Sequence, residues 1–374
     1  MSSKKIIFIV VCSISLYIYY RFGIDYVSIE LLDIPSSSSI DLTEGAAESK
    51  EYHSVYTAYT YFDHKETSRR TVSGTSMSLG SAREERQINT PNKSFVALRK
   101  VILLGEDYSR FGIGTFVDIT FSNTGSNDTA LVSITQGKAS DILKAKIEGF
   151  PSSGDYIGSL IKNSVNANFF SSDYKLMDIY VRMDAEGRNF VLPYIEIIDE
   201  KPVITGMALF KKDKMVQKIN MRDARVMNIL RENNSRGILT LQENLKKYTD
   251  YQATSKRKVK VEKQGDNYIF TINLSIKGTI ISNTLYENIL ISPDVMKKFE
   301  NDMAEHVENI CNIFIEKMQN NYKVDCLELG RDAAAKYGRG KNTDWDQIVC
   351  NSKIQVKANV KLNGVGRGNY YQKH

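Results

Sequence analysis

The sequence is poor in proline, tryptophan and histidine. Six of its 374 residues are Pro, one is Trp and four are His. So little proline excludes a proline-rich linker protein. Charged residues make up 25% and hydrophobic residues 42% of the chain, a balance that excludes an intrinsically disordered protein. The length leaves room for two or three domains of about 100–200 residues each.

Cysteine is also scarce, and no two cysteines have the C-x-x-C spacing of a zinc ribbon or a redox motif. Cys12 lies in an apolar run, which leaves Cys311, Cys326 and Cys350 for the globular part. A disulfide between two of these three is one alternative. Buried or free thiols are the prediction, because free cysteine behaves as a small buried hydrophobic residue.

Catalytic motifs are missing as well. The chain contains no H-E-x-x-H, G-x-S-x-G or Walker-type sequence. Of His53, His64, His306 and His374, only His306 falls in a long helical pattern, and it has no metal-binding partner four residues on. The glycine-rich segment 364–368 follows the last predicted strand and opens no helix, so we interpret it as a flexible tail rather than a phosphate cradle. The sequence therefore predicts no enzyme, no cofactor and no metal site.

Positive charge is in mild excess, with a formal net charge of +6. No concentrated basic patch with interleaved aromatics is present, which argues against a nucleic-acid partner. Two predicted strands do carry lysine on alternate positions: Lys256, Lys258 and Lys260, and Lys353, Lys357 and Lys361. These lysine faces could meet anionic lipid headgroups or an acidic partner. The alternative is an ordinary exposed sheet face or a guarded edge strand.

The N-terminus gives the clearest indication of where the protein is located in the cell. Lys4 and Lys5 precede an apolar and hydroxyl-rich run from Ile6 to Tyr20, which Arg21 closes. A signal peptide should end in small residues, whereas this run ends in Leu and Tyr, residues suited to a membrane interface. The sequence therefore predicts an uncleaved helical anchor over residues 1–27, with the N-terminus cytoplasmic and the rest of the chain outside. Its membrane-facing side chains are Ile6, Ile7, Phe8, Leu16, Tyr19 and Tyr20.

Three further segments follow the anchor. Residues 28–51 include a run of four serines after Pro35, a composition that predicts a polar tether or loop. Residues 52–200 alternate predicted strands and helices, which indicates an α/β domain, either as one unit or as two subdomains. Strand and helix signals begin again near residue 201, which predicts a second domain over 201–374.

The second domain has the clearest elements. Alternating side chains on both sides of Gly265 predict a long β-hairpin. Ser292-Pro293 is a typical helix start, and apolar residues at steps of three and four from Met296 to Met318 predict a long helix against a sheet. The last strand alternates from Lys353 to Leu362. The predicted fold class is α+β, with several domains, each a mostly antiparallel or mixed sheet packed with helices.

The segment from Ile204 to Val216, ITGMALFKKDKMV, is similar to the opening of the C-terminal domain of Ger(x)C-family spore germination proteins. Matches also occur at 317–319, in 325–330 (DCLELG), at Trp345-Asp346 and in the final strand. The N-terminal half matches more weakly, at Gly74, 101–106, 112–114 and 139–143. The sequence departs from the family at its N-terminus. Family members usually carry a lipobox, in which small residues precede the cysteine, whereas bulky Val10 and Val11 precede Cys12 here. Lipidation at Cys12 is therefore disfavoured, and the uncleaved helix would replace the lipid.

The resemblance implies a non-catalytic C subunit of a spore nutrient-germinant receptor. Such a subunit would lie on the outer face of the spore inner membrane, in contact with its lipids, and assemble with A- and B-type membrane subunits. No catalytic residue can be transferred from this family. The alternative from another class is a different surface-anchored binding or adhesion protein.

Overall fold

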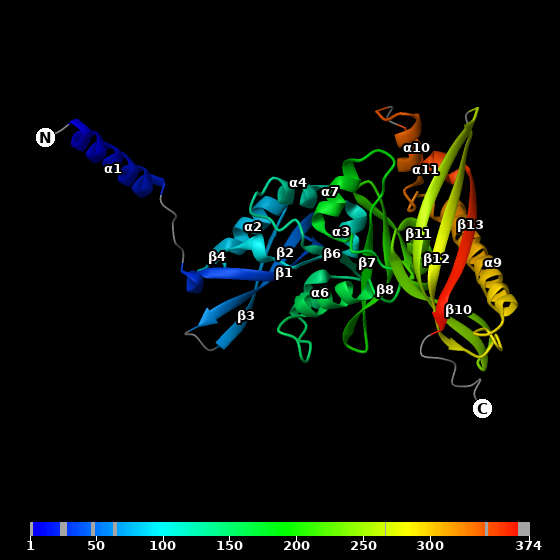
Figure 1. Ribbon diagram of the computed structural model, residues 1–374. Coiled ribbons are helices and arrows are strands. Elements are labelled where there is room, and N and C mark those ends of the chain that lie inside the picture. Colours follow the sequence, from blue (N-terminus) through cyan, green and yellow to red (C-terminus); the bar gives the residue numbers. More distant parts are fainter. Residues whose placement is uncertain are drawn as a thin grey trace.

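In the computed structural model, the chain folds into two β-sheets with helices packed on them (Figure 1). The structure describes residues 3–22, 28–45, 49–62, 66–265, 267–340 and 343–365. One continuous apolar core extends through both sheets and most of the helices. The α+β class predicted from the sequence is confirmed.

The first sheet has the strand order β3-β2-β1-β5-β6-β7-β8-β9, and the short strand β4 pairs with the start of β1. The four strands β1, β5, β6 and β7 run parallel, whereas the hairpins at each end of the sheet are antiparallel. Its strands are β1 (Leu32–Glu44), β2 (Lys50–Phe62), β3 (Glu66–Ser76), β4 (Lys93–Ser94), β5 (Val101–Gly105), β6 (Leu131–Thr135), β7 (Val191–Ile198), β8 (Lys201–Lys211) and β9 (Lys214–Asn220).

Strand β1 corrects the prediction of a polar tether over 28–51. It lies in the interior of the first sheet, paired with β2 on one side and β5 on the other, and Ser36 to Ser39 are buried. The serines are suited to this place because they are short. A Cβ atom on Gly154 of helix α6 (Ser153–Ser164) would lie 2.3 Å from the Cβ and Oγ atoms of Ser37. Close helix packing, rather than solvent exposure, accounts for the run of small residues.

Helices cover both faces of the first sheet, with α2 and α4 on one side and α6 on the other (Figure 1). Gly74, one of the weaker family matches, lies near the end of β3, and α2 begins three residues after Ser76, capped by the Ser78 hydroxyl. The remaining helices of this part are α2 (Leu79–Ile88), α3 (Glu106–Phe111), α4 (Gly114–Phe121), α5 (Ala139–Lys144) and α7 (Leu176–Asp184), with 3₁₀ turns at Ile29–Leu31 and Val96–Leu98.

The first sheet continues past residue 200, where the second domain was predicted to begin. Strands β7 and β8 form a hairpin through Asp199 and Glu200, both with positive φ, and β9 extends the sheet further. The strands of residues 201–220 therefore belong to the first sheet and not to the second. The assignment of separate domains to 52–200 and 201–374 stays a prediction.

The second sheet has the order β10-β11-β12-β13. The predicted hairpin is confirmed, with Gln264 paired to Asn267 across the turn, and the final strand adds in parallel to β12. That strand includes Gly364 and Val365, which were predicted to belong to a flexible tail; residues 366–368 lie outside the described part. The strands are β10 (Ser235–Asn244), β11 (Lys247–Gln264), β12 (Asn267–Asn283) and β13 (Lys353–Val365).

The long helix α9 (Pro293–Lys317) packs along the second sheet (Figure 1). Its start is capped as predicted, because the Ser292 hydroxyl accepts the Val295 N–H. Buried Phe299, Met303 and Val307 are part of the predicted stripe. A π-helical turn, Met318–Tyr322, ends the helix. The other helices are α8 (Met221–Arg231), α10 (Leu329–Tyr337) and α11 (Trp345–Cys350).

The N-terminal apolar run forms helix α1 (Ser3–Phe22), and residues 1–2 and 23–27 of the predicted anchor lie outside the described part. Its stretch from Ser3 to Arg21 is long and apolar enough to cross a membrane, although a signal sequence would pass the same test. The predicted anchor side chains are all exposed on this helix: Ile6, Ile7, Phe8, Leu16, Tyr19 and Tyr20.

Candidate functional site

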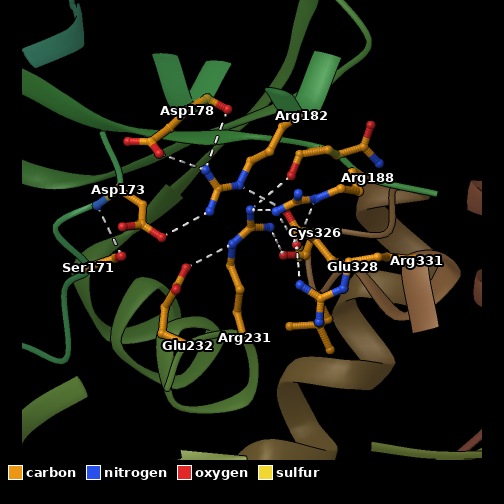
Figure 2. Close-up of polar contacts among 12 residues, drawn as sticks. Ser171, Asp173, Asp178, Arg182, Arg188, Arg231, Glu232, Cys326, Glu328 and Arg331 are labelled. Carbon is orange, nitrogen blue, oxygen red and sulfur yellow. Dashed lines mark hydrogen bonds and ion pairs between the residues drawn. The ribbon is translucent and has the colours of Figure 1, made fainter. Parts of the chain in front are cut away.

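The most concentrated group of buried charges is an arginine cluster around Glu328, where Arg182, Arg188, Arg231 and Arg331 converge on one carboxylate (Figure 2). The four arginines come from distant parts of the chain. The cluster therefore lies where the first sheet's helices meet the elements that cover the second sheet.

Local structure sets the position of each group. Arg182 lies in the last turn of α7, Arg231 is the last residue of α8, and Glu328 immediately precedes α10. Glu328 has a φ of 55°, a left-handed conformation that side-chain-bearing residues seldom adopt. This conformation ends the preceding loop and turns the carboxylate toward the arginines in Figure 2.

The contacts use both carboxylate oxygens of Glu328. Oε1 accepts from Arg182 Nε at 3.0 Å and from Arg231 Nη2 at 2.8 Å. Oε2 pairs with Arg188 Nη2 and Arg331 Nη1, each at 3.1 Å. Further acids complete the charge balance around the arginines: Asp173, Asp178 and Glu232.

Electrostatics keep Glu328 ionised. Its burial by itself would raise the pKa, but Arg231, Arg182 and Arg188 outweigh burial and lower the pKa of Glu328 to about 2. Burial likewise opposes the charge of Arg231, whereas Glu328 and Glu232 raise its pKa above the ordinary value. Such a carboxylate cannot serve as a general acid near neutral pH, because it holds no proton to give.

A second buried carboxylate, Asp325, lies three residues before Glu328 and behaves in the opposite way. Its oxygens accept the N–H groups of Leu327 (3.1 Å) and Gly330 (2.7 Å). Burial raises the pKa of Asp325 to about 6, against the lowering effect of the backbone N–H groups of Gly330 and Leu329, and the nearby Asp346 adds to the rise. The loop therefore contains one strongly ionised and one easily protonated carboxyl group.

Backbone contacts bring the same two parts of the chain together beside the cluster. Gly187 has a φ of +73°, and a Cβ atom there would lie 2.4 Å from the carbonyl carbon of Gly330. Asp346 accepts from Asn189 Nδ2 at 2.6 Å and from the Asp325 N–H at 2.8 Å. The loop after α7 and the loop before α10 are thus fastened by charge, hydrogen bonds and direct backbone packing.

The chemistry of the cluster fits a structural joint. Arg231 also donates to the carbonyls of Cys326 (2.6 Å) and Asn189 (2.9 Å), so its guanidinium is fully used in holding loops. Burial raises the pKa of the neighbouring Cys326 thiol, which keeps it protonated and unreactive. In the part of the chain that the structure describes, no group of three His, Cys, Asp or Glu side chains is placed to hold a metal ion.

A second feature is a half-open groove of about 350 Å³ between α8, β10 and α9. Its floor is apolar, with Val226, Ile229 and Ile310 among the lining residues, and His306 lies at its side. Burial and Arg222 lower the pKa of this half-buried histidine, which favours its neutral form.

Two family models match the chain in succession. The spore germination protein N-terminal domain matches residues 25–197, and the "Spore germination B3/GerAC like, C-terminal" domain matches residues 205–366. The chain belongs to the Ger(x)C family. The resemblance found in the sequence is therefore confirmed, and the junction between the two models falls in the β7–β8 hairpin.

Known relatives agree with this assignment. The spore germination protein GerQC of Bacillus cereus is 24% identical over 280 residues, which is 71% of this chain and 74% of the relative. The putative spore germination protein YfkR of Bacillus subtilis (strain 168) is 30% identical over 141 residues, or 35% and 33% of the two chains. The crystal structure of the GerBC protein aligns with a TM-score of 0.56 at 15% identity, over 87% of this chain and 97% of that one, and shows the same fold.

The Ger(x)C chain places the predicted lysines together. Lys256, Lys258 and Lys260 on β11 and Lys353, Lys357 and Lys361 on β13 are exposed on the same face of the second sheet, away from α9. β13 is an edge strand but β11 is not, so protection of a sheet edge does not explain the lysines of β11.

The remaining predicted positions are scattered. Cys12 is an exposed free thiol on α1, and Cys311, Cys326 and Cys350 are free thiols in the C-terminal half, so the preferred prediction for these three is confirmed. His53 bonds the Thr75 hydroxyl at 2.7 Å. His64 and His374 lie outside the described residues. Among these residues, Cys326 borders the arginine cluster, since its carbonyl accepts from Arg231.

Sequence reasoning missed the arginine cluster of this Ger(x)C protein. The one available signal was the segment 325–330, which carried part of the family resemblance and contains both Asp325 and Glu328. Nothing local marks Arg182 or Arg188, because they lie 146 and 140 residues from their partner. Ion pairs formed across such separations follow from the fold and not from spacing.

Proposed function

We propose that this chain is the non-catalytic, membrane-anchored C subunit of a spore nutrient-germinant receptor, needed for receptor assembly and germination signalling. The observation that carries the proposal is the succession of both Ger(x)C domain models over residues 25–366. The relative GerQC, named a spore germination protein, supports it over most of the length of both chains.

Anchoring by α1 is the second part of the proposal. The helix is apolar along its length, its side chains are exposed, and Lys4 and Lys5 precede the apolar run. Cations before an apolar helix keep that end in the cytoplasm. The bulk of the chain would then lie on the outer face of the spore inner membrane.

The lack of catalysis is supported by the character of the arginine cluster. Its arginines are matched by acids, and its central carboxylate is held ionised by three of them. An active site instead needs groups left free for a substrate. A charge-balanced cluster that holds two parts of the chain together suits a structural subunit that binds A- and B-type partners.

The test is a pull-down of the tagged chain from spore membranes, coupled to germination of a deletion strain. We expect A- and B-type subunits among the captured proteins, and slow germination that the intact chain restores. A variant without residues 3–21 serves as the control and should restore neither property. Capture of neither subunit type, with normal germination of the deletion strain, would favour the other reading, a surface-anchored binding or adhesion protein.

A further inference from the structure

Lysine is the main charged residue on the open face of the second sheet. Strands β11, β12 and β13 contain two acidic residues, Glu262 and, near the start of β11, Asp250, which accepts a hydrogen bond from the Thr240 hydroxyl of β10. Seven exposed lysines point outward: Lys256, Lys258, Lys260, Lys277, Lys353, Lys357 and Lys361. We call these seven residues the lysine face. Among the described residues, its single ion pair joins Lys260 to Glu262.

The pairing register places the lysines close together. Lys258 pairs with Asn273, which pairs with Lys357, and Thr254 pairs with Lys277, which pairs with Lys361. Lysines two positions apart on a strand are about 7 Å apart, and β11 and β13 are about 10 Å apart. These separations are within the roughly 10 Å Debye length at 0.1 M salt, so the fields of the lysines add.

The side chains between the lysines decide the class of partner. They are Gln, Asn, Ser and Thr. Within residues 252–262, 268–280 and 353–363, Ile269 is the only apolar residue in an outward position, and the exposed Ile281 lies beyond them at the far end of β12. Protein interfaces have the opposite composition, rich in aromatics and poor in lysine. A flat basic face without apolar anchors is instead suited to anionic headgroups, which attract lysine without requiring shape complementarity.

We propose that the lysine face binds the anionic surface of the same bilayer that holds α1. This proposal rests on the anchoring proposed above and adds a second, electrostatic attachment. The second sheet lies at the end of the globular part opposite to the entry of the chain into β1 (Figure 1). Two attachments so placed lay the long axis of the protein along the membrane.

Lysine footprinting of the full chain tests the proposal. The protein is reconstituted into vesicles of phosphatidylcholine alone or with one third phosphatidylglycerol, and treated with a membrane-impermeant acetylating reagent. Peptide mass spectrometry then measures acetylation of each lysine. In the anionic vesicles we expect Lys256, Lys258 and Lys357 to react about threefold or more slowly, and high salt to restore their rates. Lys138, Lys146 and Lys162, exposed on the first part of the chain, should be unchanged.

Charge reversal supplies a matched pair of variants. The triple variant K258E/K357E/K361E should remove the protection of Lys256 and Lys353, whereas K138E/K146E/K162E, with the same change in net charge, should retain it. Circular dichroism should give both variants the wild-type melting temperature, because all six side chains are exposed.

Each other outcome overturns the proposal. Equal acetylation in both lipid mixtures, with the chain floating on both vesicles, rejects the lysine face and leaves the anchor intact. Failure to float with either vesicle rejects the anchor and this proposal together. Protection that appears only after an acidic partner protein is added assigns the face to that protein instead.

Discussion

Glu328 has a strained, left-handed backbone conformation and a buried carboxylate that four arginines neutralise. A left-handed conformation costs about 1–3 kcal/mol for a residue of this type, and burial of its charge costs more. The four guanidinium groups around Glu328 offset both costs. The residue therefore stabilises the fold only as long as its charge remains.

Replacement of Glu328 by Gln should remove that balance. The variant Glu328→Gln keeps the shape of the side chain but leaves buried arginines without their counter-charge, and we expect a loss of about 3–5 kcal/mol in the free energy of unfolding. Urea denaturation followed by circular dichroism measures it. Glu262→Gln, which breaks the exposed pair with Lys260, is the control and should leave the unfolding midpoint unchanged. A loss no larger than in this control would mean that the cluster contributes nothing.

The pH dependence of stability should separate Asp325 from Glu328. Because the folded pKa of Asp325, about 6, lies above its ordinary value of 3.8, the native state binds the extra proton between these pH values, and the stability contributed by this proton is lost as the pH rises. The stability difference between the wild type and Asp325→Asn should therefore fall by up to about 3 kcal/mol from pH 4 to pH 7.

Glu328 has the opposite sign. Its folded pKa of about 2 lies below the ordinary 4.5, so its contribution is complete above pH 4.5 and is lost as the pH falls toward 2. The stability difference between the wild type and Glu328→Gln should shrink over that acidic range. Parallel pH profiles for the wild type and the two variants would contradict both assignments.

At the scale of helices and strands, sequence patterns predicted those features that depend on residues adjacent in the sequence. The cap of α9 at Ser292 and the hairpin around Gly265 both follow from residues close in sequence. β1 was misread because its serines look polar in isolation, whereas their burial follows from contacts with distant residues, such as that of Ser37 with Gly154 of α6 and that of Ser36 with the Thr57 carbonyl. The arginine cluster was missed for the same reason, since its pairs span both halves of the chain.

Two glycines at equivalent helix positions test the packing of α6 on β1. Gly154 and Gly80 are each the second residue of their helix, but a Cβ atom on Gly154 would overlap Ser37, whereas at Gly80 the nearest atom is 3.9 Å away. We expect Gly154→Ala to destabilise the protein by about 1–3 kcal/mol. Gly80→Ala should be neutral or stabilise it by up to about 1 kcal/mol. Thermal unfolding measures both, and equal effects would refute close packing at Ser37.

At the scale of the whole molecule, the N-terminal helix sets the manner of membrane attachment. Two arginines in its apolar run, Ile9→Arg with Leu16→Arg, should release the chain into the soluble fraction, because each costs about 2.5–3.5 kcal/mol within a bilayer. Cys12→Ser should leave the chain in the carbonate-washed membrane pellet, and mass analysis should find the N-terminal residues intact. Release by Cys12→Ser would reveal a lipid anchor, and a mature chain beginning after residue 20 would reveal a signal peptide.

The β7–β8 hairpin joins the two family domains within one sheet, and this has a consequence for movement. A hinge between the domains would have to break the ladder from Val191 to Leu209, and also the contacts of Glu328 with Arg182 and Arg188. Bending at that junction is therefore costly. We therefore expect the two domains to move as one rigid body. A displacement that a receptor partner imposes at one end of this chain should then move the other end as well.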